Sequence, residues 1–196
     1  MSRTASVQRT TRETDISLDI DLDSAFSENS LATGVPLFDH FLSAFQQHSQ
    51  YGIRLKARGD LAVDPHHLIE DVGICLGDAV RQALGNRGGI HRYGQRYLPM
   101  DEALVLAVVD ISGRGQLFWS GAFPERPVNN LSSELWPEFF KGFAQHAEVT
   151  LHLICHAGLN AHHVYEAAFK GFGRALAEAT MVVDPELRVP STKGML

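Results

Sequence analysis

Two pairs of adjacent histidines have the residue type and spacing for chemistry. His66-His67 precede Glu70, and the pattern returns 96 residues later, where His162-His163 precede Glu166. In a helix a residue and its fourth successor lie on nearly the same face. The first histidine of each pair and the glutamate can therefore offer a nitrogen and an oxygen to one ion. The second histidine points roughly 100° away, so adjacent histidines suit two ions better than one.

Each pair is predicted to lie in the first turn of a helix. Asp64 and Asn160 are good N-cap residues, and Pro65 suits the first helical position, so the histidines are expected at the second and third. The alternative is a polar first turn that faces solvent. Two copies with the same spacing favour metal binding, because a solvated turn needs no particular residue. Imidazole and carboxylate without thiolate suit manganese, iron or zinc, and favour manganese.

Composition limits the classes of protein. The 196 residues include 17 basic and 23 acidic side chains, a formal charge of −6, which argues against a nucleic-acid partner. The absence of an apolar signal core or a long apolar run argues against secretion and membrane crossing, so a cytoplasmic location is expected. Cys75 and Cys155 lie in apolar runs and are expected to be reduced core residues, although a pairing between them stays open.

The elements that must position the histidines follow one order twice. Residues 1–13 are polar and are expected to be mobile until something binds them. The first half is predicted to contain strands at 14–22, 24–33 and 53–57, a helix at 37–48, and the first histidine helix, ending at Gly85. The second half is predicted to contain strands at 103–111, 116–123 and 149–153, a helix at 136–146, and the second histidine helix, ending near residue 179.

The internal duplication extends beyond the histidine pairs. When the halves are aligned, Glu138 falls opposite His40, and His146 opposite His48. The expected division is 1–95 and 96–196, which together form one compact unit. The expected fold class is α+β, with two pseudo-symmetric ββαβα half-domains whose helices pack between two mixed β-sheets.

Cations beside glycines, on a helix or in the C-terminal segment are candidates for binding an anionic substrate. Ser191, Thr192 and Lys193 offer hydroxyls, backbone N–H groups and a charge, which together can form a phosphate cradle. A solvated surface charge is the usual alternative for each cation, and it is weakest for Lys170, one turn past Glu166. The other candidates are Arg92, Arg96 and Arg114.

Further motifs, taken with these, point to a known family. They are Phe38-Asp39-His40-Phe41, Gly59-Asp60, Asp101-Glu102-Ala103-Leu104, Asp110-Ile111-Ser112-Gly113-Arg114, Phe169-Lys170-Gly171-Phe172 and Pro190-Ser191-Thr192-Lys193-Gly194. Together they resemble the imidazoleglycerol-phosphate dehydratase family, in the family's order, from about Arg9 to Leu196.

The resemblance implies a hydro-lyase of histidine biosynthesis that converts imidazole-glycerol phosphate to imidazole-acetol phosphate. It also implies a ribosomal protein S5 domain 2-like fold, two manganese ions per active site, and a homo-oligomer of 24 subunits built from trimers, with sites between subunits. The implied metal ligands are His40, His66, His67, Glu70, Glu138, His162, His163 and Glu166. The implied phosphate ligands are Arg92, Arg114, Lys170, Ser191 and Lys193.

The chemistry accounts for this set of residues. A metal on each ring nitrogen would stabilise a deprotonated, imidazolate-like ring, which can expel the neighbouring hydroxyl through a diazafulvene-like intermediate. The reaction also needs a base and an acid, and the candidates are Glu166, Glu13, Asp101 and His48. For Asp101 and Glu13, at strand ends, simple solvation is the alternative.

The chain departs from the family at a few positions. Glu138 stands where several members have histidine, Pro65 replaces an acidic residue, and Leu68 replaces a threonine. The sequence after Arg92 also differs. Two other functions stay open at this stage. One is a catalytically silent relative that keeps its metals as cross-links of a shell, and the other is a metal-dependent hydrolase of phosphate esters.

Overall fold

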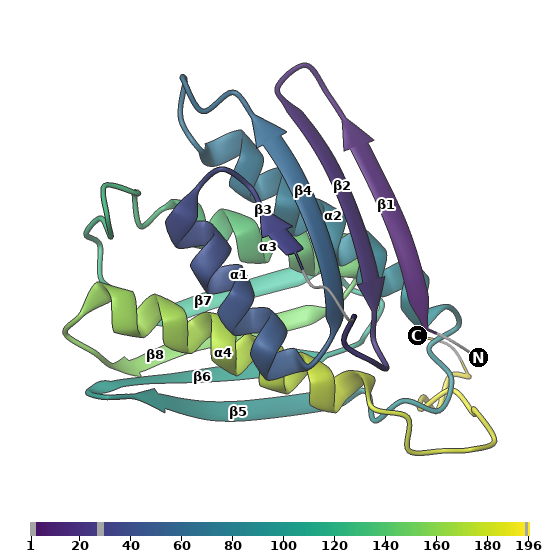
Figure 1. Ribbon diagram of the computed structural model, residues 1–196. Helices are drawn as coiled ribbons and strands as arrows, with labels where there is room; N and C mark the ends of the chain where they lie inside the picture. Colours follow the sequence, from purple (N-terminus) through teal and green to yellow (C-terminus); the bar gives the residue numbers. More distant parts are fainter. Residues whose placement is uncertain (1–2, 27–29, 195) are drawn as a thin grey trace.

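The computed structural model describes residues 3–26, 30–194 and 196, and in these residues four helices lie between two four-stranded sheets (Figure 1). The first half contains β1 (Thr4–Thr10), β2 (Thr14–Asp21), β3 (Ser30–Ala32), α1 (Pro36–Ser49), β4 (Gly52–Gly59) and α2 (His66–Leu84). The second half contains β5 (Tyr93–Met100), β6 (Ala103–Asp110), β7 (Gln116–Gly121), α3 (Leu135–Ala147), β8 (Thr150–Ala157) and α4 (Ala161–Thr180).

The two sheets have the same topology. Their strand orders are β1-β2-β4-β3 and β5-β6-β8-β7. The last pair of each sheet, β3 with β4 and β7 with β8, is parallel, and the other pairs are antiparallel. The predicted α+β class, with helices between two mixed sheets and a repeated half, is confirmed. Each half carries one more strand at its start than predicted. The division at residues 95 and 96 stays a prediction.

The expectation of a mobile N-terminal segment was wrong for the described residues 3–13. Residues Thr4–Thr10 form β1, which pairs antiparallel with β2 along its whole length. The apolar alternation is weak because only Ala5 and Val7 of this strand pack against the core. The weaker strand predicted at 24–33 is reduced to β3, and residues 27–29 of it lie outside the described residues.

The four helices form two pairs, and each pair joins the two halves of the chain. Helix α1 packs against α4, and α2 packs against α3. A Cβ atom on Gly173 would lie 2.7 Å from the Phe45 carbonyl oxygen, and one on Gly77 would lie 2.6 Å from the Phe143 carbonyl oxygen. Glycine lets the backbones approach at both crossings. Neither half therefore contains a complete helix pair of its own.

Aromatic side chains fill the space between the helix pairs. Phe41 stacks on Phe169 with ring centroids 5.3 Å apart, and Trp136 lies edge-on to Phe41 at 5.0 Å.

Cys75 and Cys155 are both buried and free, as expected for reduced core residues. Burial raises the pKa of Cys75 to about 12, which leaves the thiol protonated. None of the helices in the described part of the chain has the length and hydropathy needed to cross a bilayer.

Candidate metal centre and substrate-binding residues

The second histidine pair begins α4 as predicted. Asn160 is the N-cap residue, and its side-chain oxygen accepts a hydrogen bond from the His162 backbone N–H at 3.0 Å. The first pair differs slightly, because α2 begins at His66, one residue later than predicted. The ψ of Pro65 is 2°, outside the helical range, while the Asp64 carboxylate still accepts from the His66 N–H at 2.7 Å.

Three predicted metal ligands converge at one end of the α1–α4 pair. His40 comes from α1, and His162 and Glu166 come from α4. Their candidate ligand atoms all lie within 4.8 Å of one another, and in the described part of the chain this is the one group of three or more such side chains to do so. Glu166 Oε2 lies 3.1 Å from His162 Nε2 and 3.5 Å from His40 Nε2. Two imidazoles and a carboxylate suit a manganese, iron or zinc ion.

A lysine keeps Glu166 charged inside the protein. The Glu166 side chain is 9 % exposed, and its Oε1 lies 2.7 Å from Lys170 Nζ. Burial alone would raise the pKa of Glu166, but the Lys170 ammonium and His40 outweigh burial and lower it. Because Lys170 binds Oε1, Oε2 faces the two imidazoles as an anionic donor.

The equivalent set at the α2–α3 pair is more open. His66 Nε2 lies 3.7 Å from Glu70 Oε2, and the Glu70 side chain is 36 % exposed. Glu138, on α3, pairs with Lys141 at 2.9 Å. His66, Glu70 and Glu138 therefore do not converge as His40, His162 and Glu166 do.

The second histidine of each pair is held by a carboxylate that lies at the end of a strand or in a turn between strands. His67 Nδ1 lies 3.1 Å from Asp60 Oδ2, and His163 Nδ1 lies 2.8 Å from Glu102 Oε2. Each of these hydrogen bonds raises the pKa of the histidine. The sequence drew attention to Glu102 only as the neighbour of the acid–base candidate Asp101, and to Asp60 only as part of a family motif. Asp60 directly follows β4, and Glu102 lies at the turn between β5 and β6, so neither contact with a histidine follows from spacing along the chain.

Three of the four acid–base candidates lie near the metal ligands. Glu166 belongs to the convergent group. Glu13, at the turn between β1 and β2, lies 3.8 Å from His67 Nδ1. Asp101, at the matching turn between β5 and β6, lies 3.8 Å from His163 Nε2.

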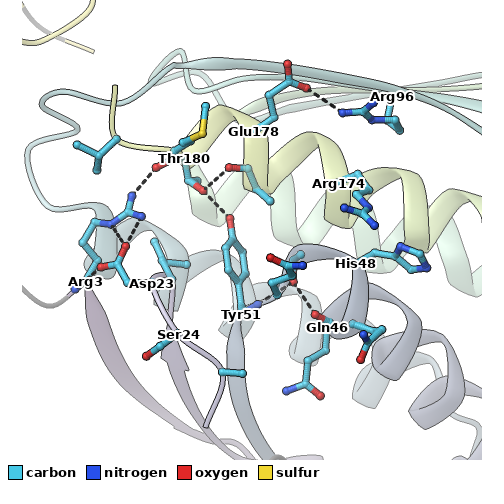
Figure 2. Close-up of a pocket in the computed structure, with 18 of the residues that line it drawn as sticks. Arg3, Asp23, Ser24, Gln46, His48, Tyr51, Arg96, Arg174, Glu178 and Thr180 are labelled. Carbon is cyan, nitrogen blue, oxygen red and sulfur yellow. Dashed lines mark hydrogen bonds and ion pairs between the residues drawn. The ribbon is translucent and has the colours of Figure 1, made fainter. Parts of the chain in front are cut away.

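His48 lies farther along α1, about 12 Å beyond His40 at the rise of an α-helix. It borders a cavity of about 1100 Å³ between the C-terminal halves of α1 and α4, together with Arg96, Arg174 and Glu178 (Figure 2). Burial and the nearby Arg174 and Lys170 cations lower the pKa of His48. Its Nδ1 is buried and has no hydrogen-bond partner among the described residues. His48 is therefore a neutral imidazole near pH 7.

Four of the five candidate phosphate ligands gather around the start of β5 and the C-terminal segment. Arg92 donates from Nε to Asp110 at 2.9 Å and from Nη1 to the Pro190 carbonyl at 2.9 Å. Arg114 Nη2 lies 4.0 Å from the same Asp110 carboxylate. Ser191 and Lys193 follow Pro190 directly, and Ser191 Oγ accepts from the Lys193 backbone N–H at 3.2 Å.

The fifth phosphate candidate, Lys170, lies beside Glu166, whereas the Arg92 group lies at the far end of α4. The Arg92 backbone N–H donates to the Ala179 carbonyl at 2.8 Å. The helix from His162 to Ala179 spans about 25 Å. In Figure 1, α4 begins on the left and ends on the right, beside the yellow C-terminal segment. The candidate metal ligands on α4 and the Arg92 group of candidate phosphate ligands are therefore far apart in one chain.

Comparisons with known proteins agree on one family. Residues 33–176 match the family imidazoleglycerol-phosphate dehydratase. The chain is 49% identical over 197 residues to an imidazoleglycerol-phosphate dehydratase of Geobacillus sp. (strain WCH70), covering 100% of both chains. It is also 49% identical over 196 residues to that of Rhodopseudomonas palustris (strain HaA2), covering 99% of this chain and 98% of the relative.

Solved structures lead to the same family. The imidazoleglycerol-phosphate dehydratase of Staphylococcus aureus superposes with a TM-score of 0.82 at 35% identity, covering 91% of this chain and 99% of that one. The structure from Pyrococcus furiosus, in complex with (S)-C348, superposes with a TM-score of 0.81 at 38% identity, covering 97% of this chain and 100% of that one.

Proposed function

The chain belongs to the imidazoleglycerol-phosphate dehydratase family, so it is a hydro-lyase of histidine biosynthesis, and we propose that it works with two manganese ions per active site. Its substrate is D-erythro-imidazole-glycerol phosphate and its product is imidazole-acetol phosphate. The observation that carries the metal proposal is the convergence of His40, His162 and Glu166, and the repeated pair His66-His67 with Glu70 supports the second ion.

The donor residues fit the proposed ions. His40, His162 and Glu166 form one preorganised set, with Glu166 kept ionised inside the protein by Lys170. His66, Glu70 and Glu138 are the equivalent residues of the second set, and His67 and His163 supply further imidazoles. When bound, the ions would stabilise negative charge on the substrate's imidazole ring and so make loss of the adjacent hydroxyl possible.

The protons are proposed to move through the carboxylates near the metal ligands. The carbon attached to the ring loses its hydroxyl, and Glu166, which is ionised, can accept the proton from the following carbon, which leaves the enol of the ketone product. Glu13 and Asp101 lie on the two equivalent turns, each 3.8 Å from a histidine nitrogen, and either can deliver a proton to the departing hydroxyl. The lowered pKa of His48 leaves a neutral imidazole that can act as a base.

The active site is proposed to be shared between copies of the chain. The glycerol chain that joins the imidazole to the phosphate is far shorter than the roughly 25 Å between the metal ligands and Arg92. The Arg92, Arg114, Ser191 and Lys193 group of one copy would therefore hold the phosphate of a substrate bound at the metal ligands and Lys170 of another. This arrangement requires a homo-oligomer, and a shell of 24 subunits built from trimers would satisfy it.

The direct test of the reaction follows the ketone product of purified, manganese-loaded protein by its enol absorbance in alkali. Turnover that disappears in His67→Ala is the expected result. Turnover of simple phosphate esters instead would identify a hydrolase. Bound manganese without turnover of either substrate would identify a catalytically silent shell protein.

A second test addresses the shared site. Glu166→Gln and Arg92→Ala, each inactive alone, are dissociated, mixed and reassembled. Recovery of roughly a quarter of the parental activity is expected, because about one site in four would combine an intact metal set with an intact cradle. Mixed oligomers that stay inactive would place the whole site within one chain.

A further inference from the structure

Glu102 makes three contacts at the start of α4. It lies at the turn between β5 and β6, and its Oε1 accepts hydrogen bonds from the backbone N–H groups of Leu159 at 3.1 Å and Asn160 at 2.7 Å. Its Oε2 lies 2.8 Å from His163 Nδ1. One carboxylate therefore binds both the loop that leads into the helix and the ring of a candidate metal ligand.

These contacts define which ring nitrogen of His163 carries a proton. The Glu102 carboxylate already accepts two backbone N–H groups through Oε1, so it acts as a hydrogen-bond acceptor at this position. An ionised carboxylate only accepts hydrogen bonds, so His163 Nδ1 must donate to it. In a neutral imidazole the other nitrogen, Nε2, then carries the lone pair that a metal ion needs.

His67 has the same arrangement with a different carboxylate. Its Nδ1 lies 3.2 Å and 3.1 Å from the two oxygens of Asp60, directly after β4. Asp60 is anchored through its own backbone N–H, which donates to the Glu13 carbonyl at 3.1 Å.

We propose that Glu102 and Asp60 are positioning residues of the two metal sites, each accepting the Nδ1 proton of one histidine so that Nε2 faces an ion. The inference rests on the proposed function, since it gives these carboxylates a task only if manganese binds. It separates Glu102 from its neighbour Asp101, whose side chain is 78 % exposed and lies 3.8 Å from His163 Nε2, the nitrogen assigned to the metal.

The two positioning residues differ in how much they hold. Glu102 binds His163 and also the two backbone N–H groups before α4, so it orients the whole first turn, including His162. Among the described residues, the hydrogen bonds of the Asp60 side chain all go to the His67 ring. Loss of the Glu102 carboxylate is therefore expected to weaken manganese binding more than loss of the Asp60 carboxylate.

The test compares Glu102→Gln and Asp60→Asn with the parent chain in its assembled form, with Glu125→Gln as an exposed-carboxylate control. If the new amide oxygen keeps the backbone hydrogen bonds, the NH₂ group faces His163 Nδ1 and donates to it. The proton then moves to Nε2 and blocks the metal. Calorimetric titration with Mn²⁺ is expected to give affinities lower by about 10–100-fold for Glu102→Gln and by less for Asp60→Asn.

A second readout separates positioning from a merely structural role. The ¹⁵N chemical shifts of the histidine rings, measured without metal, report the tautomer, and Glu102→Gln is expected to move the His163 proton from Nδ1 to Nε2. Parental affinity and an unchanged tautomer in both variants would overturn the inference while leaving the proposed function intact. A parent chain that bound no manganese would overturn both. If Glu102→Gln fails to fold, the Mn²⁺ affinity of Asp60→Asn still decides the inference, because parental affinity in that variant would contradict a positioning role for the Asp60 carboxylate.

Discussion

The α1–α4 and α2–α3 helix pairs share a backbone frame but differ in their chemistry. Gly173 lies against the Phe45 carbonyl in one pair, and Gly77 lies against the Phe143 carbonyl in the other. The two pairs differ in the arrangement of the candidate metal ligands near the beginnings of the helices. In the α1–α4 pair three ligand atoms converge around a Glu166 side chain that is 9 % exposed. In the other pair Glu70 is 36 % exposed, and among the described residues it forms no such group with His66 and Glu138.

The two helix pairs thus have the same close helix packing but differ in the charged side chains next to the candidate metal ligands. Lys170 follows Glu166 by one helical turn and binds it at 2.7 Å, while the equivalent position after Glu70 is the apolar Ile74. A close backbone crossing tolerates only glycine, so both pairs keep it. A side chain at the edge of the site has no such constraint. The two proposed ions would therefore bind in unequal environments.

The largest effect is expected from Glu166→Gln. The change removes the charge around which the α1–α4 set converges and also a proposed base, so dehydratase turnover should fall about 10³-fold. Steady-state assays of the ketone product measure the loss. Glu125→Gln, an exposed carboxylate outside both sets, should retain parental turnover. A Glu166→Gln enzyme with more than a tenth of parental activity would contradict the central place given to Glu166.

The inequality of the two sites should appear in metal titrations. Because the α1–α4 set is already convergent, fewer side chains lose freedom when an ion binds, and its affinity should be about tenfold higher. Calorimetric titration of the metal-free protein with Mn²⁺ should give two steps. His162→Ala should remove the tighter step and His66→Ala the weaker one. If both variants removed the same binding step, the two helix pairs would not bind separate ions, and the prediction would be wrong.

Lys170→Met tests the cation that only the α1–α4 pair has at this position. Loss of a proposed phosphate ligand should raise KM about tenfold or more, while manganese remains bound. The matched control is Lys141→Met, because Lys141 pairs with Glu138 at the other helix pair and is no phosphate candidate. If KM rose equally in both variants, the loss of one positive charge would explain the increase, and Lys170 would not act as a specific phosphate ligand.

The smallest effect on catalysis is expected at the two helix crossings, where α1 packs against α4 and α2 packs against α3. Substitutions there should instead lower stability. Gly77→Ala and Gly173→Ala should each lower the free energy of unfolding by roughly 1–3 kcal/mol, because the new methyl group meets a carbonyl oxygen. Urea unfolding at matched protein concentration measures it.

Gly171→Ala is the control on the same helix. Its Cβ would lie 3.5 Å from its nearest neighbours, an ordinary contact, so higher helix propensity should stabilise the protein by up to about 1 kcal/mol. Loss at Gly77 without loss at Gly173 would mean that the two crossings are not equivalent.

The sequence predicted the elements whose side chains carry a regular pattern. The alternation from Ile16 to Leu22 identified β2, and helical spacing placed His162 and Glu166 on one face of α4. It missed β5, where Gly94 leaves no room for an inward side chain, since a Cβ there would lie 1.9 Å from the Ala175 carbonyl oxygen. A strand with a glycine at such a position shows no apolar alternation.

The site was predictable only as far as local spacing reaches. His66 with Glu70 and His162 with Glu166 follow from helical geometry, and His40 followed from the family resemblance. The contacts of Asp60 with His67 and of Glu102 with His163 depend on how the ends of strands pack against the first turn of a helix, and no pattern along the chain encodes that packing. The separation of Arg92 from the metal ligands likewise emerges only from the packing of α4 against β5.

The exchange of helices between the halves also bears on the origin of the chain. His40 belongs to the first half, whereas His162 and Glu166 belong to the second, so the convergent ligand set draws on both. An ancestral gene that encoded one half would have produced two helices without partners, and a two-fold dimer would have completed both pairs at once. In a symmetric dimer the two sites would have been identical. Fusion of two such genes would have allowed the two sites to differ. From then on a single substitution, such as one giving rise to Lys170, could alter one site without altering its twin.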